Sequence, residues 1–175
     1  MLGVCGSLQA SSSNLLVLAT VSERLPPGTT FTRSEVTGDL PGFNPDLDVD
    51  PPDPAVALWR LQLAEADAVV ISTPEYAHSY PGTLKNALDW VVGSGELVDK
   101  PVALITAGPS GGQRALDALA PVLRVISSDL VGSLAIGAVR QKYDGDQLTD
   151  VDVIAELDDL LGRLVAAATS RVAGS

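Results

Sequence analysis

The sequence predicts an α/β fold in which helices cover both faces of an open, five-stranded parallel β-sheet. Five short apolar runs alternate with stretches of helical spacing, which is typical of parallel strands joined by crossover helices. Two of these runs are apolar throughout, as expected for strands buried on both faces. The length of 175 residues suits one domain over residues 1–175, with one continuous core.

Each apolar run is expected to form one strand. The runs cover residues 1–5, about 29–36, 68–71, 102–105 and about 131–137. The third and fourth runs show no alternation of apolar and polar residues, so they belong at the centre of the sheet. Helical spacing is clearest for the apolar residues of 116–126 and 153–168.

The segment 37–54 is expected to lack regular structure. It carries five of the twelve prolines and five aspartates, and proline disfavours both helices and central strands. A helix is expected directly after it, over Pro54 to Ala66, and another over 81–92, where Pro81 suits a helix start. The segment is therefore predicted to be a surface excursion within one domain.

Right-handed crossovers and short connections favour the flavodoxin-like strand order 2-1-3-4-5, a three-layer sandwich. A related doubly wound order stays open. In each such order the carboxyl ends of the first, third and fourth strands meet where ligands bind. The loops 6–14, 73–82 and 106–113 are therefore the expected site.

Composition narrows the possible partners. The formal net charge of −11 disfavours binding to nucleic acid or to an anionic membrane. No apolar stretch approaches the roughly 20 residues of a membrane-spanning helix, and the N-terminus lacks the pattern of a signal peptide. Because Cys5 is the single cysteine, no internal disulfide and no metal site are expected, and these features together indicate a cytoplasmic protein.

Loop 6–14 is rich in hydroxyl groups and precedes a helix, which suits a phosphate group. Free N–H groups and the dipole at a helix N-terminus attract an anion, and the loop's serines and Asn14 offer further donors. The alternative is that a serine only caps the helix. The spacing matches neither a Walker loop nor a Gly-x-Gly-x-x-Gly motif, which argues against a P-loop enzyme and a Rossmann dehydrogenase.

The other two loops offer backbone to a planar ring. Pro74 fixes the chain directly after the third strand, and the residues that follow can present N–H and C=O groups to a heterocycle. Tyr76 either stacks on such a ring or packs in the loop or an interface. His78, the single histidine, is either a proton donor or simply exposed. Residues 106–112 contain three glycines, which allow close approach of a ring, although an ordinary tight turn is the alternative.

Together these loops resemble those of the NAD(P)H-dependent FMN reductase family, whose members share the flavodoxin-like fold. The most specific stretch runs from Thr73 to Trp90, with a Pro-Glu-Tyr start, a Pro-Gly hinge and a Leu-Lys-Asn-Ala-Leu-Asp-Trp helix. Loop 6–14 is similar to the family's Gly-Ser-Leu-Arg-x-x-Ser-x-Asn phosphate loop, and loop 106–113 shares its Gly-Gly and Arg-Ala ending. The resemblance implies an FMN-dependent enzyme that takes a hydride from NADPH or NADH and reduces a small-molecule acceptor, such as a flavin or quinone.

The resemblance also implies which residues contact FMN, while the chemistry itself takes place on the cofactor. The implied contacts are Ser7, Gln9, Ser12, Ser13, Asn14, Pro74, Glu75, Tyr76, Ala77, Ala107, Gly108, Gly111 and Gly112. Glu75 is expected to shape its loop or pair across a subunit contact, because hydride transfer to a flavin needs no carboxylate base. No side chain is assigned as catalytic, and His78 is only a weak candidate.

Two positions depart from the family pattern. Gln9 stands where the family commonly has arginine, and Ala77 stands where it has asparagine. Loss of one charge-assisted contact to phosphate costs on the order of 1.5–3 kcal/mol, so weaker retention of FMN is expected. At Ala77 only a backbone contact carries over.

Two other functions stay open: an electron-transfer protein of the flavodoxin type, and a non-enzymatic nucleotide-binding domain. The family resemblance further implies a homodimer or homotetramer, with helix 81–92 as the candidate interface and Trp90 either in packing or on an oligomer face. The choice between NADH and NADPH also stays open, since no basic cluster marks a site for a 2′-phosphate.

Overall fold

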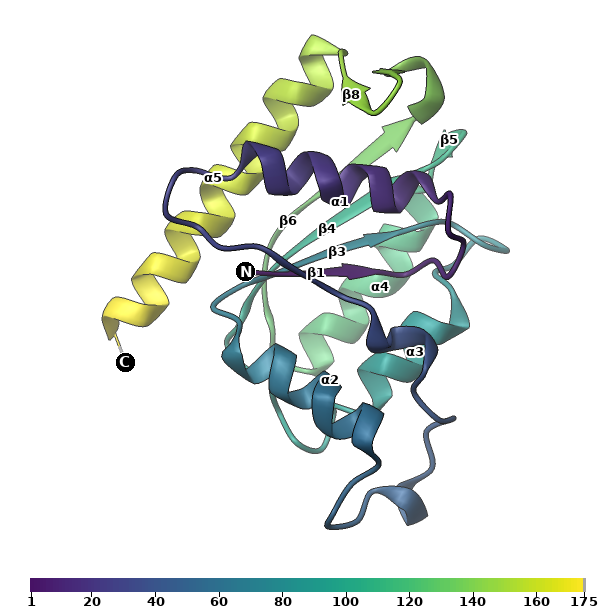
Figure 1. Cartoon of the computed structure of the whole chain (residues 1–175), viewed down its shortest axis with the longest axis vertical. Helices are drawn as coiled ribbons and strands as arrows, with labels where there is room; N and C mark the ends of the chain where they lie inside the picture. Colours follow the sequence, from purple (N-terminus) through teal and green to yellow (C-terminus); the bar gives the residue numbers. More distant parts are fainter. Residues whose placement is uncertain (175) are drawn as a thin grey trace.

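A parallel sheet with helices on both faces forms the centre of the computed structural model, which describes residues 1–174 (Figure 1). Its parallel strands are β1 (Leu2–Cys5), β2 (Thr32–Ser34), β3 (Val69–Thr73), β4 (Pro101–Ala107) and β6 (Asp129–Gly137). They lie in the order β2-β1-β3-β4-β6. Because β6 is the fifth parallel strand along the chain, the predicted order 2-1-3-4-5 is confirmed.

The sheet has one strand more than the sequence predicts. The two-residue strand β5 (Ser110–Gly111) pairs antiparallel with the end of β6, with Gly111 opposite Ile136. Gly111 has a φ of +90°, a left-handed conformation that suits glycine, so the loop after β4 can fold back along β6. The prediction of a purely five-stranded parallel sheet was therefore wrong at this edge, where the turn residues carry no strand signal.

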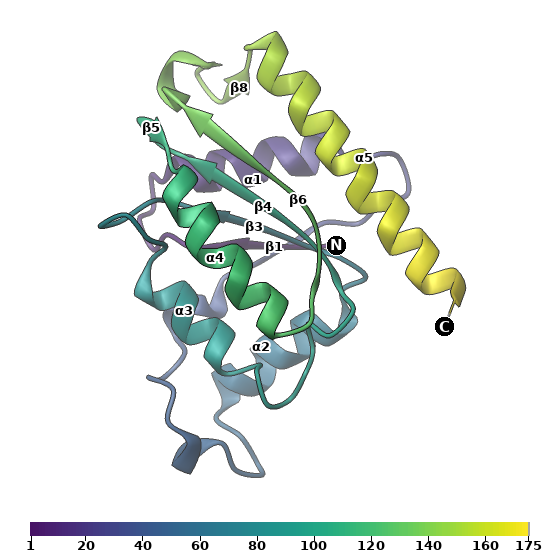
Figure 2. The same ribbon diagram turned by 180° about the vertical axis from the view of Figure 1, so that it is seen from behind.

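Side chains that alternate along the strands form two separate cores. Val69 and Ile71 of β3 face the helices α2 (Pro54–Glu65), α3 (Gly82–Asp89) and α4 (Gln113–Val125). Val70 faces the opposite side, with α1 (Ser13–Arg24) and α5 (Val151–Gly174). Figure 2 shows α4 and α3 in front of the sheet and α1 behind it. Every residue of β3 and β4 is buried, which confirms that these strands are central.

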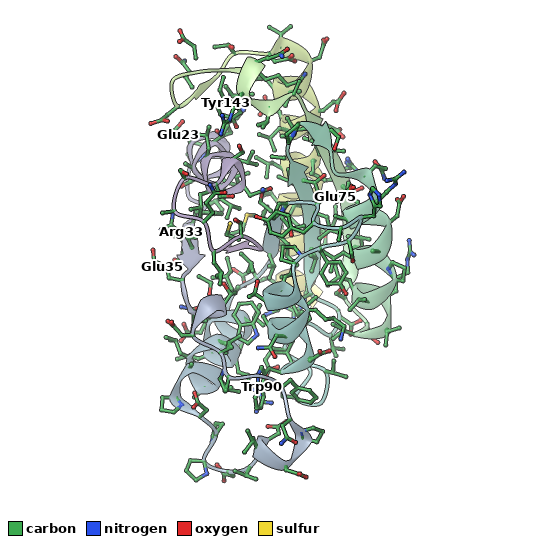
Figure 3. The ribbon with its side chains drawn as sticks, turned by 90° about the vertical axis from the view of Figure 1, so that its right-hand side faces the viewer. Glu23, Arg33, Glu35, Glu75, Trp90 and Tyr143 are labelled. Atoms are coloured by element: carbon green, nitrogen blue, oxygen red, sulfur yellow. The ribbon has the colours of Figure 1, made fainter. Side chains whose placement is uncertain are left out.

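The excursion before α2 contains only two short 3-10 turns, η1 (Val36–Gly38) and η2 (Pro45–Leu47). Two side chains of the helix segment after β3 hold it in place. Asn86 Nδ2 and Trp90 Nε1 donate to the carbonyl of Pro41 at 2.9 and 2.8 Å, and Asn86 Oδ1 accepts from the Phe43 N–H at 2.7 Å. Trp90 is buried and meets Phe43 edge to face, so it serves packing (Figure 3).

The chain ends with a small hairpin and a long helix. The 3-10 turn η3 (Val139–Gln141) follows β6 and leads into the strands β7 (Tyr143–Asp144) and β8 (Gln147–Leu148). Tyr143 ties this hairpin to α1 through a 3.0 Å hydrogen bond between its hydroxyl and that of Thr20. Among residues 1–174, no helix has both the length and the apolar character needed to cross a bilayer.

Candidate functional site

The loop after β1 carries exposed donors at the start of α1. Ser12 Oγ caps α1 by accepting from the Asn14 N–H at 3.2 Å. One serine of the loop therefore caps the helix, which is the alternative to a phosphate contact that the sequence left open. Within residues 1–174 the N–H groups of Ser11 and Ser13 have no hydrogen-bond acceptor. This end of α1 therefore offers free donors and the positive end of the helix dipole to an anion.

Gly6 allows the loop to cross closely over β3. A Cβ at Gly6 would lie 2.2 Å from Thr73 Oγ1, which is far inside van der Waals contact. Ser7 is buried, and its Oγ accepts from the Gln9 N–H at 3.2 Å. The Gly-Ser pair thus shapes the loop, and Ser7 does not line the cavity at this edge of the sheet.

Asn14 fastens this loop to the end of β4. Its side chain is buried, and it donates from Nδ2 to the Ala107 carbonyl at 3.2 Å. Its Oδ1 accepts from the Ala107 N–H at 3.2 Å and from Ser72 Oγ at 3.0 Å. The residue that the sequence suggested as a phosphate donor therefore links α1 to two strands, β3 and β4, and one Nδ2 hydrogen remains for a ligand.

The loop after β3 folds into a two-residue turn. Tyr76 and Ser79 exchange backbone hydrogen bonds at 2.8 and 3.0 Å, and the turn residues Ala77 and His78 have φ values of 50° and 62°. Positive φ at both central positions is the type I′ pattern, for which asparagine and glycine are the preferred residues. Ala77 lies at the tip of this turn, outside the lining of the cavity.

Glu75 connects this loop to α4 (Figure 3). Its Oε2 accepts from the Arg114 N–H at 3.2 Å, and its Oε1 lies 3.2 Å from His78 Nδ1. Arg114 Nη1 lies 2.5 Å from the same ring nitrogen. Glu75 thus shapes the loop, and the His78 side chain is 73% exposed and does not line the cavity.

Two backbone hydrogen bonds hold the loop after β4 against β6. The Gly108 N–H donates to the Ile136 carbonyl and the Ala138 N–H to the Pro109 carbonyl, both at 3.1 Å. Gly112 has a φ of +87°, and a Cβ there would lie 2.9 Å from the Thr106 Cβ, so this position requires glycine. By contrast, a Cβ at Gly108 would meet no atom within 4 Å and would project into open space.

A cavity of about 470 Å³ joins these loops at the carboxyl edge of the sheet. The predicted contact residues that line it are Gln9, Ser12, Ser13, Asn14, Pro74, Glu75, Tyr76, Ala107, Gly108 and Gly112. Ser7, Ala77 and Gly111 do not line it, and Gly111 is instead paired with β6. The structure thus brings most of the predicted residues together around one space.

Sequence reasoning missed one wall of this cavity. Ser11, Pro109 and Ser110 extend the predicted loops, but residues 138–141 come from the segment after β6. No hydroxyl or glycine pattern marks that segment. The signal available was topological: the fifth parallel strand lies beside β4 in the predicted order, so its carboxyl end also reaches the site.

A second cavity of about 440 Å³ shares Gln9 and Tyr76 with the first. Its other lining residues are Gly6, Leu8, Tyr80, Pro81, Gly82 and Thr83. None of these lining residues is charged. Leu8 and Tyr76 are more than half exposed, and burial raises the pKa of the Tyr80 hydroxyl. An uncharged, partly aromatic space therefore adjoins the main cavity.

Comparison with known proteins places the chain in a family. The model of the NADPH-dependent FMN reductase family matches residues 1–140. The chain belongs to this family. Its members are NAD(P)H-dependent flavin enzymes, so the predicted enzyme class, with FMN as cofactor and NADPH or NADH as co-substrate, is confirmed.

Individual relatives agree with this assignment. A quinone reductase from Escherichia coli K12 is 33% identical over 168 residues, which cover 92% of this chain and 89% of that protein. An NAD(P)H-dependent FMN reductase from Pseudomonas aeruginosa is 37% identical over 119 residues, 66% of this chain and 64% of that protein, slightly under two thirds of its length. The solved structure of FerB, a flavoenzyme NAD(P)H:(acceptor) oxidoreductase from Paracoccus denitrificans, superimposes with a TM-score of 0.82 at 28% identity, covering 97% and 96% of the two chains.

The residues of the main cavity fit FMN. The free N–H groups of Ser11 and Ser13 and the hydroxyl of Ser13 are the donors that a phosphate requires. The backbone after Pro74 and around Gly108 forms a wall with no bulky side chain at Gly108, which suits a flat ring. The cavity volume of about 470 Å³ lies within the range of cofactor sites.

Proposed function

We propose that the protein holds FMN in the main cavity and uses it to pass electrons from NADPH or NADH to a small planar acceptor. The N-terminus of α1 would hold the phosphate, and residues 74–76 and 107–112 would hold the ring system. The observation that carries this proposal is the single cavity that joins the free N–H groups of α1 to the backbone walls of the β3 and β4 loops.

The protein's own contribution is binding and orientation. When bound, FMN supplies the acceptance and release of a hydride. The α1 terminus holds the anionic end, and the Asn14 bridge to Ala107 keeps that terminus at a fixed place beside the β4 loop. Glu75 holds the loop after β3 against α4. Glu75 does not act as a base, because both of its carboxylate oxygens already have partners.

The adjoining cavity is the proposed entry for the acceptor. Its uncharged lining with Tyr76, Tyr80 and Leu8 favours a neutral, planar molecule over an anion such as chromate. Two of the relatives named above agree in kind: the Escherichia coli relative is a quinone reductase and the Pseudomonas relative reduces FMN. A quinone or a free flavin is therefore the proposed acceptor class.

We further propose a cytoplasmic homodimer or homotetramer, organised as one domain over residues 1–175. Tyr76 and Val92 are more than half exposed beside α3, which supports a subunit contact by segment 81–92. The buried Trp90 takes no direct part in such a contact. Cys5 is buried and burial raises the pKa of its thiol, which suits an unreactive structural residue.

One experiment tests the proposed function. The purified protein is titrated with FMN, and the flavin absorption is then followed without oxygen while NADPH or NADH is added. We expect bleaching by at least one nicotinamide and steady turnover when a soluble quinone is supplied. Bleaching without quinone turnover indicates an electron-transfer protein, and no flavin binding at micromolar FMN contradicts the proposal.

A further inference from the structure

Arg140 is the single cationic side chain that lines the main cavity. Within residues 1–174 its side chain makes no hydrogen bond or ion pair. This lack of a partner is notable in a chain with 22 acidic and 11 basic side chains. Six of the basic side chains pair with carboxylates, namely Arg24, Arg33, Arg60, Lys85, Lys142 and Arg163.

The backbone holds Arg140 in place although its side chain is exposed. Arg140 lies in the turn η3, between Val139, which is buried, and Gln141, which is exposed. The Ala138 N–H donates to the Pro109 carbonyl at 3.1 Å, and the Gln141 N–H donates to the Ala138 carbonyl at 2.8 Å. This arrangement fixes the base of the arginine at the cavity wall and leaves its guanidinium free to reach a ligand.

The same cavity contains the free N–H groups of Ser11 and Ser13, but loop 6–14 has no lysine or arginine. A phosphate monoester carries close to two negative charges at neutral pH, and the acidic chain repels such a group at long range. The one carboxylate of the cavity lining, Glu75, already engages His78 and Arg114 and leaves Arg140 unpaired. A guanidinium binds phosphate oxygens through paired, charge-assisted hydrogen bonds.

We propose that Arg140, from the segment after β6, binds the phosphate of FMN and thereby makes the site select FMN over riboflavin. This inference rests on the proposed function, in which the cavity holds FMN. The positive charge of the phosphate site then comes from Arg140 in the segment after β6, while loop 6–14 supplies uncharged hydrogen-bond donors.

Flavin fluorescence titrations test this role without any turnover. The flavin-free protein is titrated with FMN and with riboflavin, for the parent chain and for Arg140→Gln, Arg140→Lys and Arg124→Gln. Arg124 is an exposed arginine in the last turn of α4, outside the cavity, so Arg124→Gln removes the same charge elsewhere. We expect Arg140→Gln to weaken FMN binding about tenfold to a hundredfold and to leave riboflavin binding unchanged. Arg140→Lys keeps part of the affinity, and Arg124→Gln has little effect.

The other outcomes are distinct. If Arg140→Gln weakens the binding of FMN and of riboflavin equally, or weakens neither, the role of Arg140 is overturned, but the proposed flavin site is not. An unchanged FMN affinity with a raised KM for NADPH assigns Arg140 to the nicotinamide nucleotide and overturns the inference. A parent chain that binds neither flavin overturns the proposed function and this inference together.

Discussion

The side-chain amide of Asn14 hydrogen-bonds to both backbone groups of Ala107, at 3.2 Å in each case. This pair joins the first turn of α1 to the end of β4. The β1 and β4 loops are far apart in sequence, and their relative position defines the cavity between them. Asn14, the asparagine of the family's loop motif, thus connects the β1 loop to the β4 loop in this protein.

Replacing Asn14 tests this tie. Asn14→Ala removes two side-chain hydrogen bonds to the backbone of the buried Ala107, so we expect a loss of about 1–3 kcal/mol in the free energy of unfolding. Urea unfolding measures the change. Asn44→Ala is the matched control, because Asn44 is exposed and its side chain accepts only from the Asp46 N–H. Equal losses for the two variants would refute the special role of Asn14.

The turn at Ala77 is strained. Its φ of 50° suits glycine or asparagine better than alanine. We expect Ala77→Gly and Ala77→Asn to raise the free energy of unfolding by about 0.5–1 kcal/mol, and Ala77→Val to lower it. Thermal or urea unfolding of the three variants checks this order. The idea fails if Ala77→Gly is no more stable than the parent chain.

The asparagine and tryptophan of the helix motif hold the 37–54 excursion. Asn86→Ala removes one of the two donors to the Pro41 carbonyl and frees the Phe43 N–H. We expect faster cleavage within 37–54 in limited proteolysis, with a loss of about 0.5–1.5 kcal/mol in unfolding free energy. Lys85→Ala on the same helix removes only the exposed pair with Asp89, so it serves as the control. If Asn86→Ala is cleaved as slowly as the parent chain, the hydrogen bonds of Asn86 do not hold the 37–54 excursion.

Asp150 gives a prediction about acid stability. Hydrogen bonding to the Lys142 ammonium, and then to the Val153 N–H, lowers the pKa of Asp150 below its usual value of 3.8. A lowered pKa in the folded state adds stability at pH values above the unfolded pKa, and this stability is lost as the pH falls through the folded pKa. Asp150→Asn should therefore be less stable than the parent chain at neutral pH, and the two should converge below pH 3.8.

Urea unfolding over this pH range measures the convergence. Asp146→Asn removes a charge from the neighbouring turn between β7 and β8 and should run parallel to the parent chain. A constant difference between Asp150→Asn and the parent chain at all pH values would mean that the carboxylate charge does not matter.

Much of the fold could be predicted because periodicity and topology depend on local patterns. The unbroken apolar runs became β3 and β4, and the crossover rules gave the order of the five parallel strands. The β5 strand escaped prediction because its two residues, Ser110 and Gly111, pair with β6 through backbone alone. A pairing made by backbone alone leaves no pattern of side chains from which the sequence could predict it.

The site was predictable where a motif has its own local geometry. Loop 6–14 and the Pro-Glu-Tyr stretch both line the cavity. Two features depend on tertiary contacts that no local motif marks. Asn14 proved to bridge to Ala107, which lies 93 positions away in the chain, and Arg140 enters the cavity from a segment with no motif.

Gly108 offers the most direct test that FMN occupies the main cavity. A Cβ there meets no protein atom within 4 Å, and Gly108 lines the cavity, so Gly108→Val should leave the unfolding free energy nearly unchanged while it narrows the space proposed for the ring. Gly42→Val is the matched control, since Gly42 also has no atom within 4 Å of an added Cβ and lies outside the cavity. The measurement is the FMN dissociation constant from flavin fluorescence. We expect Gly108→Val to weaken FMN binding at least about tenfold, a loss of about 1.4 kcal/mol, with Gly42→Val unchanged. Full FMN affinity in a folded Gly108→Val protein would contradict the placement of FMN in this cavity.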